Sequence, residues 1–326
     1  MPAPFSPGPP LPLSPELGRH YAVFVDTEEE FDWSAPFSRA ATHTSATRAL
    51  PNATHKLNAL GIEPIYLCDY PVITQAQSAP VIQALLAEHR CWIGAHLHPW
   101  VTPPYAEDIS RKNSFASNLD LATEAAKLDV LTGAIHQLTG HHPKIYRAGR
   151  YGIRPESFPL LTQRGYRLDV SIRPHFDYHA EGGPDFSSHP VHPWRTAAGI
   201  VCLPMTSTFI GHCRRFPSLY RARPLRGAAA RTGLLLRIPL TPEGITLAQA
   251  RAAIAALDDD GVSLFSLSFH SPSLVPGHTP YVRSRADLDL FWRWWEGIAE
   301  TFDQRGIKPA NGQVLLDLLT PDQIRR

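Results

Sequence analysis

Short runs of apolar residues alternate along this chain with longer stretches in which apolar side chains recur every three or four positions. A short run is typical of a buried strand, and a periodic stretch indicates a helix with one buried face. The runs that predict strands occupy residues 21–25, 62–68, 92–95, 144–147, 167–171 and 262–269. The stretches that predict helices occupy residues 46–60, 79–89, 119–139, 156–164, 247–257 and 285–302. Strands that alternate with helices in this way predict a parallel sheet covered by helices.

The most regular of these helices is expected at residues 285–302. Its large apolar residues fall on one face: Leu288, Phe291, Trp292, Trp295, Ile298 and Phe302. Ser284, with Asp287 three positions later, resembles an N-terminal capping arrangement. In the helix expected at 46–60, Pro51 indicates that the helix begins or bends at that point.

The chain of 326 residues contains no convincing linker. We therefore expect one barrel-like domain at residues 19–326. Residues 172–235 are rich in Pro, Gly, His and Arg, which predicts an irregular insertion, and strand-like pieces occur near 200–204 and 235–240. Seven of the first 20 residues are proline, so residues 1–18 predict a flexible, polyproline-like tail.

Composition and charge narrow the class of protein. The formal net charge of +1 gives no reason to expect nucleic-acid binding. No apolar run reaches the roughly 18 residues that a membrane span needs, and the first residues lack the pattern of a secretory signal. The four cysteines show no C-x-x-C spacing, and Cys68 and Cys91 lie in or beside predicted strands, so core packing is their expected role. We expect a cytoplasmic protein; the sequence indicates no oligomeric state.

Three segments that follow predicted strands carry the residues best suited to catalysis or metal binding. They are Asp26-Thr27-Glu28, His96-Leu97-His98-Pro99 and Phe269-His270-Ser271-Pro272. Functional groups collect at the carboxyl ends of strands in barrel folds. Residues two apart in an extended segment point to the same face, so Asp26 and Glu28 are expected to project together, as are His96 and His98.

These groups could form a metal-dependent hydrolytic site. One carboxylate and two imidazoles leave an open position on a metal for water, and the second carboxylate is then free to act as a base. Each segment also has an ordinary explanation, because carboxylates are common in solvated turns and a single histidine is often structural. A second histidine pair, His189 and His192, competes for a metal, although a surface loop is also consistent with its irregular surroundings.

Together with two further segments, these residues resemble the polysaccharide deacetylase (NodB-homology) superfamily, carbohydrate esterase family four, and within it the WalW-like branch. The segments that carry the resemblance keep the order of the family: Val25-Asp26-Thr27-Glu28, Gly94-Ala95-His96-Leu97-His98-Pro99-Trp100, Tyr146-Arg147-Ala148-Gly149-Arg150-Tyr151-Gly152 and Phe269-His270-Ser271-Pro272-Ser273-Leu274, with Pro280-Tyr281 following. The resemblance implies a distorted (β/α) barrel of about seven parallel strands. It also implies metal-assisted removal of N- or O-linked acetyl groups from a polysaccharide or sugar conjugate.

By position, the resemblance assigns catalytic roles to four side chains. Asp26 is implied as the general base, and Arg147 as the cation that keeps it ionised. His270 is implied as the acid that protonates the leaving group, with Asp169 as its orienting partner. The backbone near Tyr151 is implied to bind the oxyanion.

The resemblance further implies a divalent metal, with zinc suited to the mixed nitrogen and oxygen ligands Glu28, His96 and His98. Two departures from the family pattern leave the details open. The usual adjacent Asp-Asp pair is here Asp-x-Glu, so either carboxylate could meet the metal. The usual histidines lie four apart, but the residue four after His96 is Trp100, so His98 either replaces the second ligand or leaves a site with one histidine.

The substrate is expected to be a carbohydrate, and an anionic one is an open alternative. No acidic residue lies between Asp185 and Glu243, a stretch that carries eight of the arginines: Arg195, Arg214, Arg215, Arg221, Arg223, Arg226, Arg231 and Arg237. They either bind an anionic glycan or form a solvated face. Aromatic residues in or near the motif loops either stack on sugar or pack the loops: Trp33, Trp100, Tyr151, Tyr220 and Tyr281. Two other functions stay open, a hydrolase of small non-sugar amides and a non-catalytic glycan-binding relative.

Overall fold

The computed structural model describes residues 5–13, 18–32, 35–216, 218–221 and 231–320. In this part of the chain, seven consecutive strands of one sheet run parallel, in the order β10-β1-β2-β3-β4-β5-β7. Their bounds are β1 (Arg19–Thr27), β2 (Ile65–Cys68), β3 (Trp92–Leu97), β4 (Ile145–Ala148), β5 (Leu168–Asp169), β7 (Val201–Cys202) and β10 (Leu264–His270). The prediction of about seven parallel strands is confirmed.

Short strands extend and close this sheet. β11 (Ile307–Pro309) pairs with β1, and β6 (Trp194–Arg195) runs antiparallel to β7. β8 (Ser207–Ile210) and β9 (Leu236–Pro239) form a separate antiparallel pair. Hydrogen bonds from Thr206 N to Ser266 O (3.2 Å) and from Ser268 N to Leu240 O (3.3 Å) join this pair to β10. The curled sheet is therefore bridged across its open side and forms a distorted barrel.

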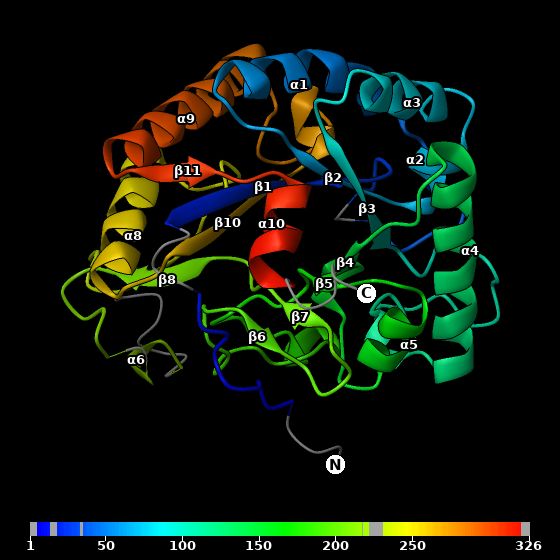
Figure 1. Cartoon of the computed structure of the whole chain (residues 1–326), viewed down its shortest axis with the longest axis horizontal. Helices are drawn as coiled ribbons and strands as arrows, with labels where there is room; N and C mark the ends of the chain where they lie inside the picture. Colours follow the sequence, from blue (N-terminus) through cyan, green and yellow to red (C-terminus); the bar gives the residue numbers. More distant parts are fainter. Residues whose placement is uncertain (1–4, 14–17, 33–34, 217, 222–230, 321–326) are drawn as a thin grey trace.

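Helices cover the outside of the barrel and one of its ends (Figure 1). The outer helices are α1 (Leu50–Ala59), α2 (Tyr70–Thr74), α3 (Ala79–Ala87), α4 (Leu121–Thr139), α5 (Ser157–Gln163), α8 (Leu247–Asp259) and α9 (Arg285–Gln304). α10 (Gly312–Leu319) covers the end at which the strands begin, and α6 (Ser218–Arg221) is a single turn. Short 3-10 helices complete the structure: η2 (Ser45–Ala49), η3 (Ala116–Asn118), η4 (Gly149–Tyr151), η5 (His179–Glu181) and η6 (Ser271–Leu274). Among the described residues, no helix combines the length and apolarity of a membrane span.

Helix starts follow the sequence signals. Pro51 lies in the first turn of α1, where its missing N–H costs no hydrogen bond. The Ser284 side chain accepts a hydrogen bond from Asp287 N, and the Asp287 carboxylate accepts one from Ser284 N. The expected capping arrangement of α9 is therefore confirmed.

Alternation along the strands separates two apolar layers. In β1, Ala22 and Phe24 point into the barrel, whereas Tyr21 and Val23 pack against the helices outside. The same alternation turns every second residue of β3, β4 and β10 inward. Polar residues at inward positions near the ends of these strands must therefore meet at one mouth of the barrel.

Two expectations about irregular regions are wrong in part. Residues 172–235 were expected to be an insertion, but they supply β7, which is part of the parallel sheet. Residues 1–18 were expected to be a flexible tail, but the described part, 5–13, contacts the barrel: the Phe5 ring lies 5.7 Å from that of Phe158, and Leu11 N donates to Pro193 O (2.7 Å). Apolar residues between the prolines explain the difference, because they can bury surface without regular secondary structure.

Candidate active site

A cavity of about 340 Å³ opens where the parallel strands end. Strand register builds it, since Asp26 of β1 lies beside His270 of β10, and His96 of β3 lies beside Arg147 of β4. The residues that line it include most of the predicted site: Asp26, Glu28, His96, His98, Arg147, Tyr151 and His270. Segments separated by more than 240 positions in the sequence thus contribute to one site.

Glu28, His96 and His98 form a buried group whose ligand atoms face one another. Glu28 Oε2 lies 3.4 Å from His96 Nε2 and 3.5 Å from His98 Nε2. The other ring nitrogen of each histidine is engaged, because His96 Nδ1 lies 3.2 Å from the Arg147 carbonyl oxygen and His98 Nδ1 lies 2.7 Å from Glu29 Oε2. A proton on each Nδ1 leaves both Nε2 atoms as acceptors that converge on Glu28. Two imidazole nitrogens and a carboxylate fit a divalent cation such as zinc.

Burial shapes the protonation of this group. Burial raises the pKa of Glu28 to about 7 and lowers the pKa of His98 to about 4. Both shifts have the same physical cause, since the charged form of each group is disfavoured away from water. A bound cation would reverse the balance at Glu28 by stabilising its carboxylate.

Trp100 and Glu29 lie behind the histidines. Trp100 is only 2% exposed; its ring stacks on His98 at 4.2 Å, and its Nε1 donates to Glu29 Oε1 (2.8 Å). The prediction that Trp100 binds substrate is wrong, because the turn that follows β3 places its ring in the interior, against His98 and Glu29. Together with Glu29, which in turn accepts from His98, it fixes the His98 ring. The sequence analysis assigned no role to Glu29, although it directly follows Glu28.

Asp26 is buried against a cation. Arg147 Nη1 donates to Asp26 Oδ1, and its Nε donates to Val170 O (3.0 Å). Burial by itself would raise the pKa of Asp26, but the Arg147 guanidinium and the nearby rings of His96 and His270 hold it below its ordinary value. Asp26 is therefore an ionised carboxylate at neutral pH, as predicted for a base.

His270 lies beside Asp26, and Glu243 holds its ring. Its Nε2 is 3.7 Å from Asp26 Oδ2, and its Nδ1 is 2.7 Å from Glu243 Oε2. Burial works against the imidazolium, but the carboxylates of Glu243, Glu28 and Asp26 outweigh it and raise the pKa of His270 to about 10. The ring is therefore protonated at neutral pH.

The prediction that Asp169 orients His270 is wrong. Asp169 follows the inward-facing Leu168 and so turns to the outer side of the sheet, where its carboxylate accepts hydrogen bonds from Ser171 Oγ (2.5 Å) and Ser171 N (3.2 Å). Glu243 takes the role instead. It comes from the loop after β9, and no local pattern in the sequence marks it.

A strained turn forms one wall of the cavity. Arg150 (φ 54°) and Tyr151 (φ 62°) both have left-handed backbone conformations, which are uncommon outside glycine. Gly149 precedes them, and a Cβ atom there would lie 2.6 Å from the Leu97 carbonyl oxygen and would collide with the His98 ring. The turn after β4 thus packs directly on a candidate metal ligand.

Cationic and aromatic side chains form the rest of the wall. Arg150 pairs with Glu181. Arg173 forms no ion pair with a carboxylate in the described ranges. It donates a hydrogen bond to the Tyr178 hydroxyl (3.0 Å), and its guanidinium lies over the Phe176 ring at 3.9 Å. Of the expected aromatic rim, Tyr151 and Tyr281 line the cavity.

The predicted arginine stretch contributes little to this cavity. Arg214 pairs with Asp260 (3.0 Å), and Arg195 donates to Gly199 O and Leu319 O (both 3.2 Å). Arg237 stacks on Phe176 at 3.4 Å, next to the cavity wall. Arg223, Arg226 and Trp33 lie outside the described residues. The cations that line the cavity, Arg147, Arg150 and Arg173, come from other parts of the chain.

The second histidine pair does not join a candidate metal group in the described part of the chain. His189 is buried between aromatic rings, 4.9 Å from Phe5 and 5.1 Å from Phe186. Burial lowers its pKa to about 4. The expectation of a surface loop is therefore wrong for His189, which packs as a neutral ring.

Comparison with solved structures identifies the fold. A protein from Mycobacterium smegmatis, whose polysaccharide deacetylase activity is itself inferred, superposes with a TM-score of 0.59 at 18% sequence identity, over 98% of this chain and 96% of that one. The chain has the polysaccharide deacetylase fold. The predicted resemblance to that superfamily and the distorted barrel are thereby confirmed at the level of fold, whereas the WalW-like branch stays a prediction.

Two other structures superpose less closely. A family 4 carbohydrate esterase from Streptomyces lividans gives a TM-score of 0.44 at 10% identity, over 90% of this chain and 92% of that one. The Xyl-CE4 domain of a xylanase from the hindgut metagenome of Trinervitermes trinervoides gives 0.44 at 9% identity, over 92% and 90%. No family model and no curated protein matches the sequence.

Proposed function

We propose that this protein is a metal-dependent hydrolase that removes acetyl groups from a carbohydrate or sugar conjugate. The observation that carries the proposal is the arrangement in one cavity of an ionised carboxylate, a protonated imidazole and a separate Glu-His-His group. Amide and ester hydrolysis needs a base, an acid and a means of polarising a carbonyl, and each has a candidate here.

Glu28, His96 and His98 would hold the metal, for which we propose zinc. When bound, a divalent cation supplies Lewis acidity, which lowers the pKa of water and polarises an acyl carbonyl. The hydrogen bonds of His96 to the Arg147 carbonyl and of His98 to Glu29 orient both rings before any ligand arrives. We therefore propose Glu28 as the ligand carboxylate, together with both histidines.

Asp26 would then act as the base. Its Oδ1 is engaged by Arg147, so Oδ2, which faces His270, is the oxygen available to take a proton from water. The guanidinium keeps the carboxylate ionised at neutral pH and also limits its basicity.

His270 would deliver a proton to the departing amine or alcohol. Its Nδ1 is held by Glu243, which leaves Nε2 directed at the cavity. Protonation at neutral pH suits an acid, because the proton is already present when the leaving group needs it. The turn at Tyr151 would contribute backbone N–H groups near the developing oxyanion, since left-handed turns gather such donors.

The cavity wall favours an anionic sugar. Within the described ranges no carboxylate lies within 4 Å of Arg173, although this guanidinium lines the cavity. An uncompensated cation in a half-enclosed site favours a carboxylate or phosphate substituent on the substrate. Tyr281, which is 48% exposed at the rim, would offer a face for stacking on a sugar ring.

Metal content and acetate release together test the proposal. Purified protein should bind about one equivalent of zinc, and Glu28→Ala, His96→Ala and His98→Ala should each reduce zinc binding. Zinc-loaded enzyme should release acetate from N-acetylated or O-acetylated oligosaccharides, faster from those that carry a uronic acid. Asp26→Asn should retain zinc and lose activity by roughly two to four orders of magnitude.

Controls separate the parts of the proposal. His192→Ala, from the histidine pair outside the cavity, should leave zinc and activity unchanged. Stoichiometric zinc without acetate release from any acetylated sugar would reject the deacetylase function and point to a hydrolase of another amide or to a binding protein. Zinc retained in all three ligand variants would reject the metal site.

A further inference from the structure

A second cavity, of about 880 Å³, lies at the opposite end of the barrel. Trp92, Lys144 and Arg167 line it, and these residues stand at or just before the first positions of β3, β4 and β5. The candidate active site, by contrast, lies where the strands end. The volume is within the range of roughly 300–1,000 Å³ that small-molecule sites occupy. None of the residues assigned to catalysis or metal binding lines this cavity.

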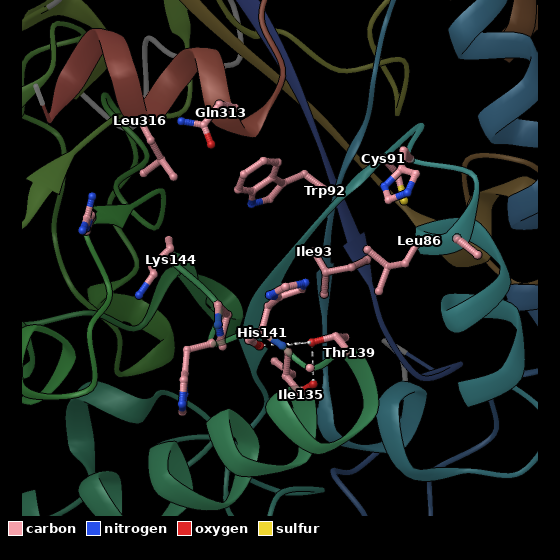
Figure 2. Close-up of a pocket in the computed structure, with 16 residues that line it drawn as sticks. Leu86, Cys91, Trp92, Ile93, Ile135, Thr139, His141, Lys144, Gln313 and Leu316 are labelled. Atoms are coloured by element: carbon pink, nitrogen blue, oxygen red, sulfur yellow. Dashed lines mark hydrogen bonds between the residues drawn. The ribbon is translucent and has the colours of Figure 1, made fainter. Parts of the chain in front are cut away.

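One side of this cavity is apolar. Ile93, Ile135 and Leu316 are buried in its wall, and the Trp92 ring lies between β3 and α10 (Figure 2). α10 closes the cavity from one side with Leu316 and Gln313, and the end of α4 closes it from another with Ile135 and Thr139. These elements would surround an apolar ligand body and remove it from water.

The other side of the cavity carries uncompensated positive charge. Lys144 and Arg167 are half-buried neighbours, joined through a hydrogen bond from Arg167 N to Lys144 O (2.9 Å). No carboxylate lies within 4 Å of either side chain in the part of the chain that the structure describes. Burial and the adjacent Arg167 charge both lower the pKa of Lys144, as expected for two cations without a counter-charge. None of the 16 lining residues is acidic.

Negative charge lies instead near the opposite wall. Burial, assisted by the carboxylates of Glu63 and Glu88, raises the pKa of Cys91 to about 12. Cys91 and Lys144 occupy opposite sides of the cavity (Figure 2). An anionic group would therefore be attracted to the Lys144 side and repelled from the Cys91 side, which gives a bound ligand a preferred direction.

We propose that this cavity binds a small amphipathic anion, one carboxylate or phosphate group on an apolar body. The anionic group would lie between Lys144 and Arg167, and the apolar body would extend along Trp92, Ile93 and Leu316. Binding there does not depend on the proposed deacetylase activity, because the two cavities share no lining residue.

Isothermal titration calorimetry of the full chain tests this site. Decanoate and decyl phosphate are the probes, and decanol is the uncharged comparison. We expect saturable one-to-one binding of at least one anion, and affinity weaker by about tenfold or more in the double variant Lys144→Met/Arg167→Met, which removes the charge-assisted contacts. Lys308→Met, an exposed lysine of β11 at the same end of the barrel, should bind like wild type.

Further readouts keep the test decisive if the double variant fails to fold, which its melting temperature would show. The single variants should then each weaken anion binding, and decanol should bind wild type more weakly than the anion that binds best. Binding should also change tryptophan fluorescence in wild type and not in Trp92→Phe. The proposal would be overturned by absence of saturable anion binding. It would also be overturned if Lys144→Met and Arg167→Met both kept the wild-type affinity, or if decanol bound wild type as tightly as the anion does.

Discussion

Glu243 controls the protonation of His270 in this structure, so its removal should change the stability of the fold in a pH-dependent way. The pKa of His270 is raised to about 10 with Glu243 as the main favourable partner, so this pair stabilises the fold fully below the unfolded pKa of about 6.5. That contribution is lost as pH rises through the folded pKa. We expect Glu243→Gln to lower the melting temperature most in mildly acidic solution and least near pH 10.

The same variant should also change the pH dependence of acetate release. A protonated His270 is needed as acid, so the alkaline limit of kcat/KM in wild type should follow its raised pKa, and Glu243→Gln should move that limit toward neutral pH by about one unit or more. Asp169→Asn is the matched control, since its carboxylate contacts Ser171 on the outer side of the sheet. An equal shift of the alkaline limit in both variants would contradict this assignment, because it would show that Asp169 affects the pKa of His270 as much as Glu243 does.

Gly149 packs so closely against the candidate metal site that its position leaves no room for a side chain. A Cβ atom at this position would collide with the His98 ring, so Gly149→Ala should displace that ring and weaken zinc binding by about ten- to a hundredfold. Gly133→Ala is the control, because a Cβ atom there meets nothing within 4 Å and its position is inside α4. Zinc titration of both variants measures the effect; wild-type affinity in Gly149→Ala would show that His98 is not a ligand.

At the scale of elements, α4 organises the loop that follows β3. Lys127 Nζ donates to the carbonyl oxygens of Pro99 (2.9 Å), Thr102 (2.6 Å) and Pro104 (2.7 Å) and lies 3.1 Å from Glu107 Oε1. Its side chain is completely buried. This one ammonium group therefore ties the loop after His98 to a helix on the outside of the barrel.

Removal of that ammonium group should loosen the loop. Lys127→Met leaves the Glu107 carboxylate and three carbonyl groups without their partner, at a cost of about 3–5 kcal/mol in the free energy of unfolding. Hydrogen exchange at residues 99–107 should accelerate, and denaturant unfolding should show the loss. Lys112→Met, on the exposed surface of the same loop, should change neither measurement. Unchanged exchange in Lys127→Met would mean that the loop is held by its own contacts.

Element patterns also explain which site residues could be predicted. Asp26, His96 and His270 follow apolar strands at positions whose alternation turns them into the barrel, so spacing and strand ends were sufficient to find them. The same rule, applied strictly, turns Asp169 outward, since Leu168 and Val170 on either side of it point inward. The prediction for Trp100 was wrong for a different reason: this residue lies in the turn after β3, where Glu29 and neighbouring aromatic rings enclose its side chain.

Glu243 and Arg173 could not be found by such patterns. Both lie in loops without periodicity. Arg173 lines the cavity, and Glu243 contacts His270 from the loop after β9, a strand that helps to bridge the open side of the barrel. The bridging contacts join residues about 60 positions apart, such as Thr206 and Ser266. Long-range contacts of this kind depend on the complete fold, so no local stretch of the sequence predicts them.

At the scale of the whole molecule, the proline-rich N-terminal segment is part of the fold. Phe5 packs among Phe158, Phe186 and His189, and Pro10 forms a bridge with Trp194. The segment thus covers aromatic rings that would otherwise meet solvent. Its described part, residues 5–13, does not line the candidate active site.

Deletion of residues 1–13 should therefore reduce stability without changing the chemistry. Loss of the Phe5 contact alone should cost about 1.5–3 kcal/mol, and the melting temperature should fall by several degrees. Phe5→Ala should reproduce much of this loss, whereas Pro9→Ala, at an exposed position of the same segment, should not. Because the segment packs on the barrel wall away from the catalytic cavity, kcat/KM below the melting temperature should stay at the wild-type value. A deletion variant with unchanged melting temperature would show that the segment is the flexible tail that its proline content suggests.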